Sequence, residues 1–167
     1  SAERLVELDL PGYAVGGLSV GEGPERMAEV LDGVDGLFPA DRPRYLMGVG
    51  EPRDVLAGVA AGIDMFDCVL PTRNGRNAQA FTWNGRIKLR NAAHARSAEP
   101  IEPGCECAAC RQFTRAAIRH YFQANEMLGP TLVTIHNLAW FADFMRAIRS
   151  AIAAGRFDAA RREWLRR

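Results

Sequence analysis

Three cysteines stand within a single short segment, residues 103–112, whose sequence is PGCECAACRQ. The spacing Cys-x-Cys-x-x-Cys lets the thiolates of Cys105, Cys107 and Cys110 converge from one tight turn. Thiolates this close repel one another unless a cation lies between them. Because a tetrahedral zinc site takes four soft or borderline ligands, the pattern predicts three zinc ligands and requires a fourth. The alternative is a set of reduced cysteines that binds no metal.

Four residues are candidates for the fourth ligand: Cys68, His94, His120 and His136. Cys68 falls in an apolar segment, where a buried cysteine packing as a small hydrophobic residue is the plainer interpretation. His136 ranks first, because it falls in the first turns of a predicted long helix, where two helices could pack around the cluster. Zinc with four protein ligands has no open position for water, so the predicted site is structural and chemistry lies elsewhere.

Asp67 is the carboxylate best placed for chemistry, since it lies at the end of an apolar strand between Phe66 and Cys68. A buried aspartate is costly unless it is paired or used, and from the residues alone a structural salt bridge is as good an explanation as catalysis. In parallel α/β folds the chemistry lies at the carboxyl ends of the strands. The other predicted strand ends carry Gly16-Gly17-Leu18 and Met47-Gly48.

Short apolar strands alternate with helical stretches in the first part of the chain. Strands are predicted over residues 13–18, 44–49 and 65–71, and helices over residues 24–34 and 51–62. In the second helix a proline suits the first turn and a glycine suits the end. Strand, helix, strand, helix, strand with short connections predicts a parallel sheet with right-handed crossovers, the repeating unit of Rossmann-like sheets and TIM barrels.

The alternation stops after Pro71. Asn74-Gly75 and Asn84-Gly85 are turn signals, and β-prone residues on both sides of the second predict a hairpin insertion. Further helices are predicted over residues 111–129, 131–152 and 156–167, the first of them closed by Gly129. The long middle helix is predicted to bury one apolar face, made of Leu138, Phe141, Met145 and Ile148.

The composition is that of a folded domain, with 167 residues, 48% of them hydrophobic and 25% charged. The formal charge of +1 means that any nucleic-acid contact must come from a local group of basic residues. No apolar run approaches the roughly 20 residues of a membrane span, and the first ten residues lack the regions of a signal peptide. We therefore expect a cytosolic protein, whose reducing surroundings favour a metal site over disulfides.

Four ordered motifs together carry a resemblance that covers nearly the whole chain. They are YAVGGLSVGE, YLMGVG, GIDMFDCVLPTRNGRNAQAFT, and CECAAC followed by TIHN. The sequence resembles the queuine tRNA-ribosyltransferase family, also called tRNA-guanine transglycosylases, in its bacterial form. The resemblance implies a TIM barrel with a zinc-binding insertion, and the exchange of the wobble guanine of tRNA for 7-aminomethyl-7-deazaguanine in queuosine biosynthesis.

The resemblance also implies roles for residues of the base site. Asp67 matches the family's nucleophile, which attacks C1′ of the wobble ribose and forms a covalent ribosyl-enzyme. Gly17 and Leu18 match the segment whose backbone lines the base pocket, and Met47 matches the residue stacked on the base. Glu22 matches a carboxylate that fixes the peptide at Leu18.

Two further sites follow from the same resemblance. Arg73 and Arg76 match the arginines that hold the anticodon loop, whereas without the family a solvated basic turn is the default. The histidine of TIHN, His136, matches the fourth ligand of one structural zinc ion per chain.

The resemblance also divides the chain. Residues 1–71 are expected to form the last three strands of the barrel, residues 72–130 the hairpin and zinc-binding insertion, and residues 131–167 the helices that complete the zinc site and the barrel. We expect a C-terminal portion that lacks the aspartates that recognise the purine, is inactive alone, and forms a homodimer when full length.

Two alternatives remain from the sequence. A non-catalytic, zinc-stapled tRNA-binding subunit or fragment would need the cysteines, Arg73 and Arg76, but not Asp67. An archaeal-type transglycosylase would be expected to continue into further RNA-binding domains.

Overall fold

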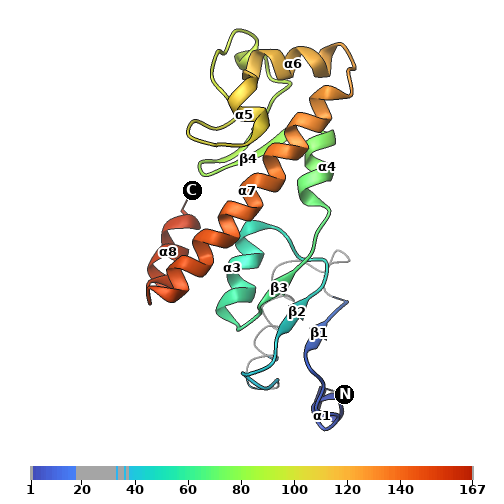
Figure 1. Ribbon diagram of the computed structural model, residues 1–167, viewed down its shortest axis with the longest axis vertical. Helices are drawn as coiled ribbons and strands as arrows, with labels where there is room; N and C mark the ends of the chain where they lie inside the picture. The colour runs from blue at the N-terminus through green and yellow to red at the C-terminus, as the bar shows by residue number, and fades with distance from the viewer. Residues whose placement is uncertain (1, 18–32, 34–35, 37, 167) are drawn as a thin grey trace. The chain divides into compact units, whose positions relative to one another are not determined.

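The computed structural model of the protein describes residues 2–17, 33, 36 and 38–166, and it divides into two compact units, Ser1–Val69 and Leu70–Arg167. The first unit contains α1 (Ala2–Val6), β1 (Tyr13–Val15), β2 (Arg44–Leu46), α3 (Pro52–Ala60) and β3 (Met65–Phe66) (Figure 1). The second contains α4 (Leu70–Arg76), β4 (Gln79–Thr82), β5 (Gly85–Lys88), the short 3-10 helix η1 (Ala92–His94), α5 (Ala108–Gln112), α6 (Arg115–Gln123), α7 (Leu128–Ala153) and α8 (Phe157–Trp164).

The sheet of the first unit is parallel, as the alternation of strands and helices predicts. Its three strands lie in the order β1-β2-β3, with Ala14 opposite Tyr45 and Tyr45 opposite Met65. Apolar side chains from the strands and their connections pack into one cluster, whose buried members are Tyr13, Phe38, Leu46, Val49 and Ile63. The predicted helix over residues 24–34 lies outside the described residues, apart from residue 33.

The helix predicted over residues 51–62 is confirmed as α3. Pro52 occupies its first position, where the missing N–H breaks no helical hydrogen bond. Gly62 follows the end of the helix with φ 81°, a left-handed conformation that a glycine adopts without steric cost. Two residues, Ile63 and Asp64, then connect Gly62 to β3.

The strand predicted over residues 65–71 is wrong beyond Phe66, because the chain turns into α4 at Leu70. The Asn74-Gly75 pair was predicted to form a turn and instead lies inside α4, with both residues buried. A Cβ atom at Gly75 would lie 3.0 Å from the backbone of Thr134 on α7. Gly75 therefore serves the close approach of two helices and not a turn.

The hairpin predicted around Asn84-Gly85 is confirmed. β4 and β5 pair antiparallel, with Gln79 opposite Lys88 and Thr82 opposite Gly85. The hydroxyl of Thr82 donates a hydrogen bond of 2.7 Å to the carbonyl oxygen of Gly85, which fastens the turn.

The helix predicted over residues 111–129 is two helices, so that prediction is wrong in its boundaries. Thr114 interrupts it and caps α6, its hydroxyl accepting a hydrogen bond from the Ala117 amide at 3.2 Å. After α6 the chain reverses through Asn125, which has φ 56°. Gly129 does not close a helix but lies in the first turn of α7, where a Cβ atom would come 3.2 Å from the Phe122 side chain.

The long helix α7 is confirmed, but the face predicted to be buried is only partly correct. Ile148 is buried, Phe141 and Met145 are half-buried, and Leu138 is 52% exposed. The buried residues of α7 include Leu132, Val133, His136, Asn137, Trp140, Phe144, Ile148 and Ala151. Apolar residues surround most of this helix, so the sequence pattern alone does not fix which face is covered.

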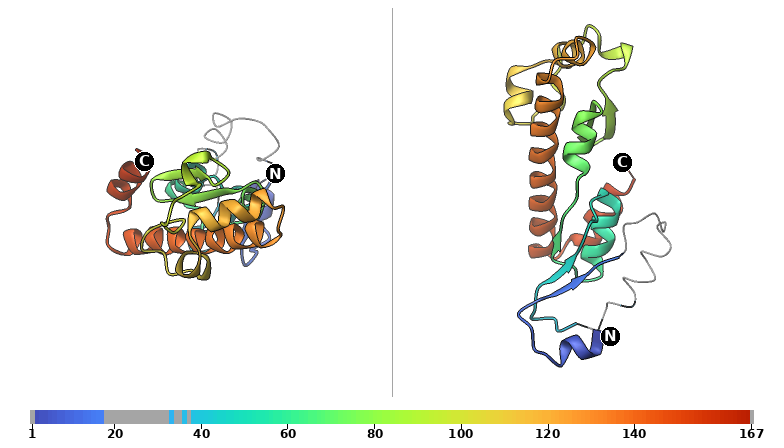
Figure 2. Two further views of the ribbon diagram at one scale, coloured as in Figure 1. Left: turned by 90° about the horizontal axis from the view of Figure 1, so that it is seen from above. Right: turned by 90° about the vertical axis from the view of Figure 1, so that its right-hand side faces the viewer.

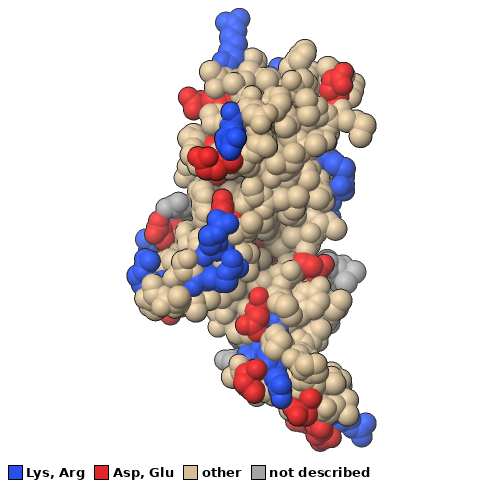
Figure 3. Space-filling model, in the orientation of Figure 1, with Lys and Arg blue, Asp and Glu red and all other residues tan. Residues whose placement is uncertain are grey.

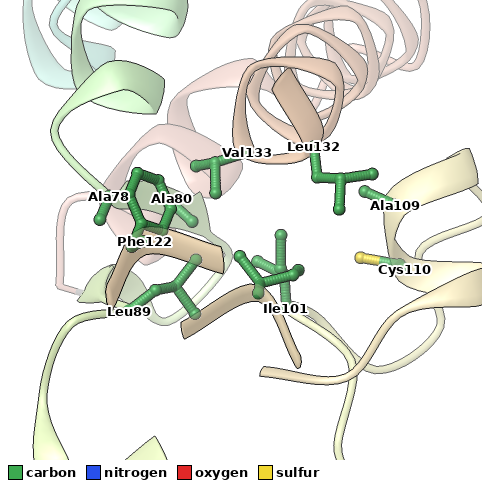
Figure 4. Close-up of a cluster of buried hydrophobic side chains, with 10 residues drawn as sticks. Ala78, Ala80, Leu89, Ile101, Ala109, Cys110, Phe122, Leu132 and Val133 are labelled. Atoms are coloured by element: carbon green, nitrogen blue, oxygen red, sulfur yellow. The ribbon is translucent and has the colours of Figure 1, made fainter. Parts of the chain in front are cut away.

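Helix α7 organises the second unit. Both the front view of Figure 1 and the right-hand view of Figure 2 show α4 lying alongside it, and α6 crosses its N-terminal end. The core between these helices and the hairpin is drawn in Figure 4, where Leu89 and Ile101 face Leu132 and Val133 of α7. Cys110 belongs to the same cluster, so the core and the cysteine segment are continuous.

A second group of aromatic side chains fastens α8 and the hairpin to α7. The ring of Trp83 lies 5.5 Å from that of Trp140, 6.2 Å from that of Phe144 and 6.3 Å from that of Trp164. The predicted C-terminal helix is thus confirmed and is held by its tryptophan.

Charged side chains of both signs are interspersed on the face shown in Figure 3, as the formal charge of +1 leads one to expect. In the described part of the chain, no helix combines the length and the apolar character needed to cross a membrane.

Candidate active site and metal centre

The three parallel strands of the first unit end at the same edge of their sheet. The residues that follow them are Gly16 and Gly17 after β1, Met47 and Gly48 after β2, and Asp67 after β3. β1 and β2 remain hydrogen-bonded up to this edge, since the Met47 amide donates a hydrogen bond of 2.9 Å to the Val15 carbonyl. The strand-end residues singled out from the sequence, where described, therefore lie at one edge.

Asp67 is exposed at this edge, so the prediction of a buried carboxylate is wrong. The reason is that β3 ends at Phe66, which leaves Asp67 beyond the paired part of the strand. One carboxylate oxygen, Oδ1, accepts a hydrogen bond of 2.7 Å from the Tyr45 hydroxyl and another of 2.7 Å from the Gly48 amide. Both donors are neutral groups, a hydroxyl and a backbone amide. These contacts therefore differ from the structural salt bridge that the sequence left open as an alternative to catalysis.

The same contacts affect ionisation. The hydrogen bond from the Gly48 amide, and then the one from the Tyr45 hydroxyl, lower the pKa of Asp67 below its ordinary value. The hydrogen bond to Asp67 is in turn the largest cause that raises the pKa of Tyr45, whose hydroxyl keeps its proton and donates it. Asp67 is therefore ionised at neutral pH, as a carboxylate nucleophile must be.

Residues predicted to bind the base fall partly inside and partly outside the described chain. The Met47 side chain is 46% exposed, and a Cβ atom placed on Gly16 would lie 3.5 Å from its sulfur atom. Gly17 is exposed and has φ 84°. Leu18 and Glu22 lie outside the described residues.

Arg73 and Arg76 belong to the second unit, where both are exposed on α4. Their spacing of three residues places them on the same face of the helix. The structure thus gives two neighbouring cationic side chains on a helix, in place of the basic turn suggested by the sequence.

The cysteine segment and α7 form a compact cluster of possible metal ligands. The ligand atoms of Cys105, Cys107, Cys110 and His136 all lie within 4.8 Å of one another. The distances from His136 Nδ1 to the three sulfur atoms are 3.7, 3.8 and 3.3 Å, in the same order. Bonds of about 2.3 Å to sulfur and about 2.0 Å to nitrogen place these atoms about 3.5 Å apart in a tetrahedral zinc site.

The orientation of the His136 ring fits a metal ligand. Its other nitrogen, Nε2, lies 2.8 Å from the carbonyl oxygen of Phe81, which can only accept a hydrogen bond, so Nε2 carries the proton. Burial lowers the pKa of His136, which favours the neutral ring. The Nδ1 lone pair is then directed at the three sulfur atoms, as metal coordination requires.

The thiols need a cation to ionise. Burial is the largest cause that raises the pKa of both Cys105 and Cys110, and the neighbouring sulfur of Cys107 raises it further. Because metal ligation takes thiolates, a dication supplies the compensation that this pocket lacks by itself. Three thiolates and one imidazole are a donor set that zinc accepts in a four-coordinate site, so the residues fit the ion.

Hydrogen bonds around the Cys3His cluster involve residues that the sequence does not single out. The Glu102 side chain, only 8% exposed, accepts a hydrogen bond of 3.0 Å from the Trp83 amide, and the Glu102 carbonyl accepts one of 3.2 Å from the Cys105 amide. Cys107 caps α5 through a hydrogen bond of 3.4 Å from the Cys110 amide to its sulfur. These contacts fix the path of the segment between the hairpin and α5.

Asn137 is a second unpredicted residue of importance. Its side chain is completely buried; its oxygen accepts a hydrogen bond from the Phe81 amide, and its amide donates to the carbonyl oxygens of Pro71 and Gln79, each at 3.0 Å. The pair His136-Asn137 therefore ties α7 to the hairpin and to the start of α4. In the sequence, Asn137 was marked only by its place as the last residue of the motif TIHN.

The profile of the family described as queuine tRNA-ribosyltransferase matches residues 1–167. The chain belongs to this family. Among its curated relatives, the queuine tRNA-ribosyltransferase of Caulobacter vibrioides is 53% identical and that of Pelotomaculum thermopropionicum is 56% identical, each over all of this chain and 45% of the relative's length. That of Symbiobacterium thermophilum is 54% identical over all of this chain and 42% of its own length. The chain thus spans about half the length of the curated relatives it matches.

Membership in the queuine tRNA-ribosyltransferase family confirms the resemblance found in the sequence motifs. The expected α/β class with a parallel sheet is present in the first unit, and the expected Cys3His cluster is present in the second. The cluster contains neither Cys68 nor His94 nor His120, the other candidates for the fourth ligand.

Tyr45 is the residue of the strand-end site that the sequence analysis missed. A signal for it existed in the strand pattern, since Tyr45 precedes Met47 by two residues and pairs with Met65, two residues before Asp67. Side chains two residues apart on a strand share a face, so Tyr45 and Asp67 are on the same side of the sheet.

Proposed function

We propose that this chain carries the nucleophile of a tRNA-guanine transglycosylase, and that Asp67 is that nucleophile. The reaction class follows from the family, whose curated members are named queuine tRNA-ribosyltransferase. The single observation that supports the role of Asp67 is its state at the strand-end edge. The carboxylate is exposed and low in pKa, and the hydrogen bonds that other described residues donate to it all go to one oxygen.

The chemistry is a double displacement at C1′ of the wobble ribose. A carboxylate oxygen of Asp67 forms a bond to C1′ while the bond from C1′ to the guanine nitrogen breaks and its electron pair leaves with the base. The incoming 7-aminomethyl-7-deazaguanine then attacks C1′, loses its ring N–H proton, and displaces the carboxylate. Two inversions give net retention, the logic of retaining glycosidases.

A carboxylate suits this reaction because the transition state resembles an oxocarbenium ion. The negative charge of Asp67 stabilises the positive charge that develops on the ribose, and the ester it forms remains cleavable. Across the two steps the departing guanine gains one proton and the incoming base loses one, so the exchange balances.

Residues around Asp67 receive supporting roles in the proposal. Met47, half-exposed at the same edge, stacks on the base, and Gly17 with Leu18 presents backbone groups to it. Glu22 fixes the peptide at Leu18. The glycine backbone suits this position, because a chain without Cβ can lie close to a purine edge.

The second unit has two roles in the proposal. Arg73 and Arg76, exposed on α4, hold the anticodon loop through its phosphates. One zinc ion, bound by the three cysteines and His136, is structural. It would join residues 105–110, which include the first turn of α5, to α7, and with four protein ligands it supplies no water for catalysis.

The proposal also includes the domain boundaries, the binding partners and the cellular location expected from the sequence. Residues 1–71 belong to the barrel, residues 72–130 to the zinc-binding insertion, and residues 131–167 to the helices that complete both. The partners are tRNA, the 7-deazaguanine base and, at the relatives' full length, a second copy of the protein. The reaction takes place in the cytoplasm, and the 167-residue chain does not perform it alone.

The test is the exchange of labelled guanine into tRNA by an enzyme of the relatives' full length that carries this sequence. Asp67→Asn removes the ionised oxygen with little change of shape, so exchange should fall by at least about a thousandfold while tRNA affinity stays within about twofold. Asp64→Asn, which alters a carboxylate on the same strand segment, is the matched control and should keep most of the activity. If the Asp67→Asn enzyme exchanged guanine as fast as the unaltered enzyme, the nucleophile would have to be another residue. Undiminished tRNA binding with no exchange by the unaltered enzyme would support the non-catalytic tRNA-binding alternative.

A further inference from the structure

Two hydrogen-bond donors converge on the same oxygen of Asp67. The Tyr45 hydroxyl and the Gly48 amide each lie 2.7 Å from Oδ1. The distance from the Gly48 amide is at the short end of the range for N–H···O hydrogen bonds, and the distance from the Tyr45 hydroxyl is typical of O–H···O hydrogen bonds. Among the described residues these are the hydrogen bonds that other residues donate to the carboxylate, which leaves Asp67 Oδ2 for bonding to another molecule.

Neighbouring strand ends supply both donors. Tyr45 lies in β2 opposite Met65, so its side chain shares a sheet face with Asp67 and its ring reaches along the strand to the carboxylate. Gly48 follows β2 with φ 74°, a conformation that an L residue rarely adopts, and in it the amide is directed at Asp67. One donor is thus a side chain of β2 itself, and the other is a backbone amide two residues beyond the end of that strand.

We propose that Tyr45 is a positioning residue for the exchange reaction, acting with the Gly48 amide as an anchor on Asp67 Oδ1. The anchor makes Oδ2 the atom that bonds to C1′ of the ribose, and it makes the carboxylate the better leaving group when the ribosyl ester is resolved. This inference rests on the proposed role of Asp67 as the nucleophile.

The energetic argument concerns the difference between a carboxylate and an ester. A donor binds the ionised oxygen of a carboxylate more strongly than the carbonyl oxygen of an ester. In the ester, Asp67 Oδ2 is bonded to C1′ and Oδ1 has become the carbonyl oxygen, still facing both donors. When the incoming base attacks C1′, the bond from C1′ to Oδ2 breaks and its electron pair returns to the carboxylate. The charge spreads onto Oδ1, where the two hydrogen bonds strengthen.

The anchor thus shifts the balance between ester and free carboxylate toward the free carboxylate. Loss of one donor has two linked effects, because protonation and ester formation both remove the charge that the donor stabilises. The pKa of Asp67 rises, and the covalent ester becomes more populated. A variant that merely lost its structure would not show a larger population of ester. It would form less ester and would also be less active.

The experiment is a comparison of Tyr45→Phe with Tyr13→Phe, in an enzyme of the relatives' full length that carries this sequence. Tyr13 is the matched control, since it lies in the same sheet and, within the described residues, its buried hydroxyl has no hydrogen-bond partner. One readout needs no tRNA: the pKa of Asp67, followed by NMR of ¹³C-labelled aspartate side chains. The second is the fraction of tRNA that stays attached to the enzyme in denaturant, in the absence of added base. The third is the rate at which added base releases that tRNA.

Tyr45→Phe should raise the pKa of Asp67, increase the ratio of attached to free tRNA about tenfold and slow release by added base about tenfold. Tyr13→Phe should change none of these quantities. An unchanged pKa of Asp67, or a Tyr45→Phe enzyme with less attached tRNA than the unaltered enzyme, would overturn the inference. Failure of the proposed function looks different: the pKa of Asp67 would still rise, but the unaltered enzyme would attach no tRNA.

Discussion

His136 Nε2 donates a hydrogen bond of 2.8 Å to the carbonyl oxygen of Phe81, and this contact decides which nitrogen of the ring faces the cysteines. Phe81 lies on β4 of the hairpin and His136 on α7, so the ligand is oriented by an element outside the cysteine segment. The proton on Nε2 leaves Nδ1 free to bind a cation, and three sulfur atoms surround it at 3.3–3.8 Å. The candidate metal-binding cluster therefore depends on α7 and the hairpin as well as on the cysteine segment.

Purified protein should contain about one zinc ion per chain, because four ligands of the right type meet in one place. His136→Ala should remove most of the zinc, and chelation of the unaltered protein should lower its thermal midpoint by about 10 °C, since binding of a structural ion adds to folding stability. Elemental analysis and thermal unfolding check both. His120→Ala, which changes an exposed histidine of α6, should keep the zinc. Folded protein that contains no zinc would refute the assignment.

Asn137→Ala should destabilise the protein by about 2–4 kcal/mol, because it leaves buried backbone groups of Phe81, Pro71 and Gln79 without their partner. Denaturant unfolding measures the change. Asn77→Ala is the matched control, since Asn77 is exposed and its side chain donates only to the Arg73 carbonyl, at 3.1 Å. Its cost should stay below about 0.5 kcal/mol. Equal effects of the two substitutions would show that Asn137 does not join the elements as described.

Arg73→Ala and Arg76→Ala should each weaken tRNA binding and reduce its dependence on salt. A cation that neutralises one phosphate of a single-stranded loop contributes about 0.7 to the slope of log K against log salt concentration. Binding isotherms at several salt concentrations measure this slope. Arg146→Ala, which removes an exposed arginine paired with Asp143 on α7, should leave the slope unchanged. A slope that does not respond to either α4 arginine would exclude them from the phosphate contacts.

Several features of the fold could be predicted because local residues determine them. The hairpin follows from Asn84-Gly85 between β-prone residues, and α3 follows from Pro52 at its start and Gly62 at its end. The parallel sheet follows from the alternation of strands and helices. In each case the chemistry of a few neighbouring residues was sufficient.

The errors arose where a distant contact decides the structure. Gly75 resembles a turn residue, but its missing Cβ serves the approach of Thr134, which lies far along the chain. Leu138 has the spacing of a buried residue on a helix that is apolar over most of its surface, so only the packing partners select the covered face. The burial of Asp67 was overestimated because the length of β3 depends on its pairing with β2.

The same distinction applies to the sites. The cysteines could be recognised from spacing within one segment, whereas His136 was one of several candidates until the family resemblance singled it out. Tyr45 was missed because its relation to Asp67 runs across two strands and appears only once their register is known.

The 167-residue chain alone should show no measurable exchange of labelled guanine. The described residues form a parallel sheet of three strands, with β1 and β3 at its edges, whereas a closed TIM barrel has eight strands to surround a substrate. Positioning supplies a large part of such a rate. An exchange assay with the isolated chain, beside an enzyme of the relatives' full length, tests this expectation. Activity of the isolated chain near that of the longer enzyme would contradict it.

The most direct test of the account is to locate the covalent bond to tRNA. An enzyme of the relatives' full length that carries this sequence is incubated with tRNA, quenched in denaturant, and digested with nuclease and protease for mass spectrometry. The account predicts a ribose-linked peptide with the modification on Asp67, and no such peptide from the Asp67→Asn enzyme. A ribose-linked peptide that maps to any other residue would contradict it.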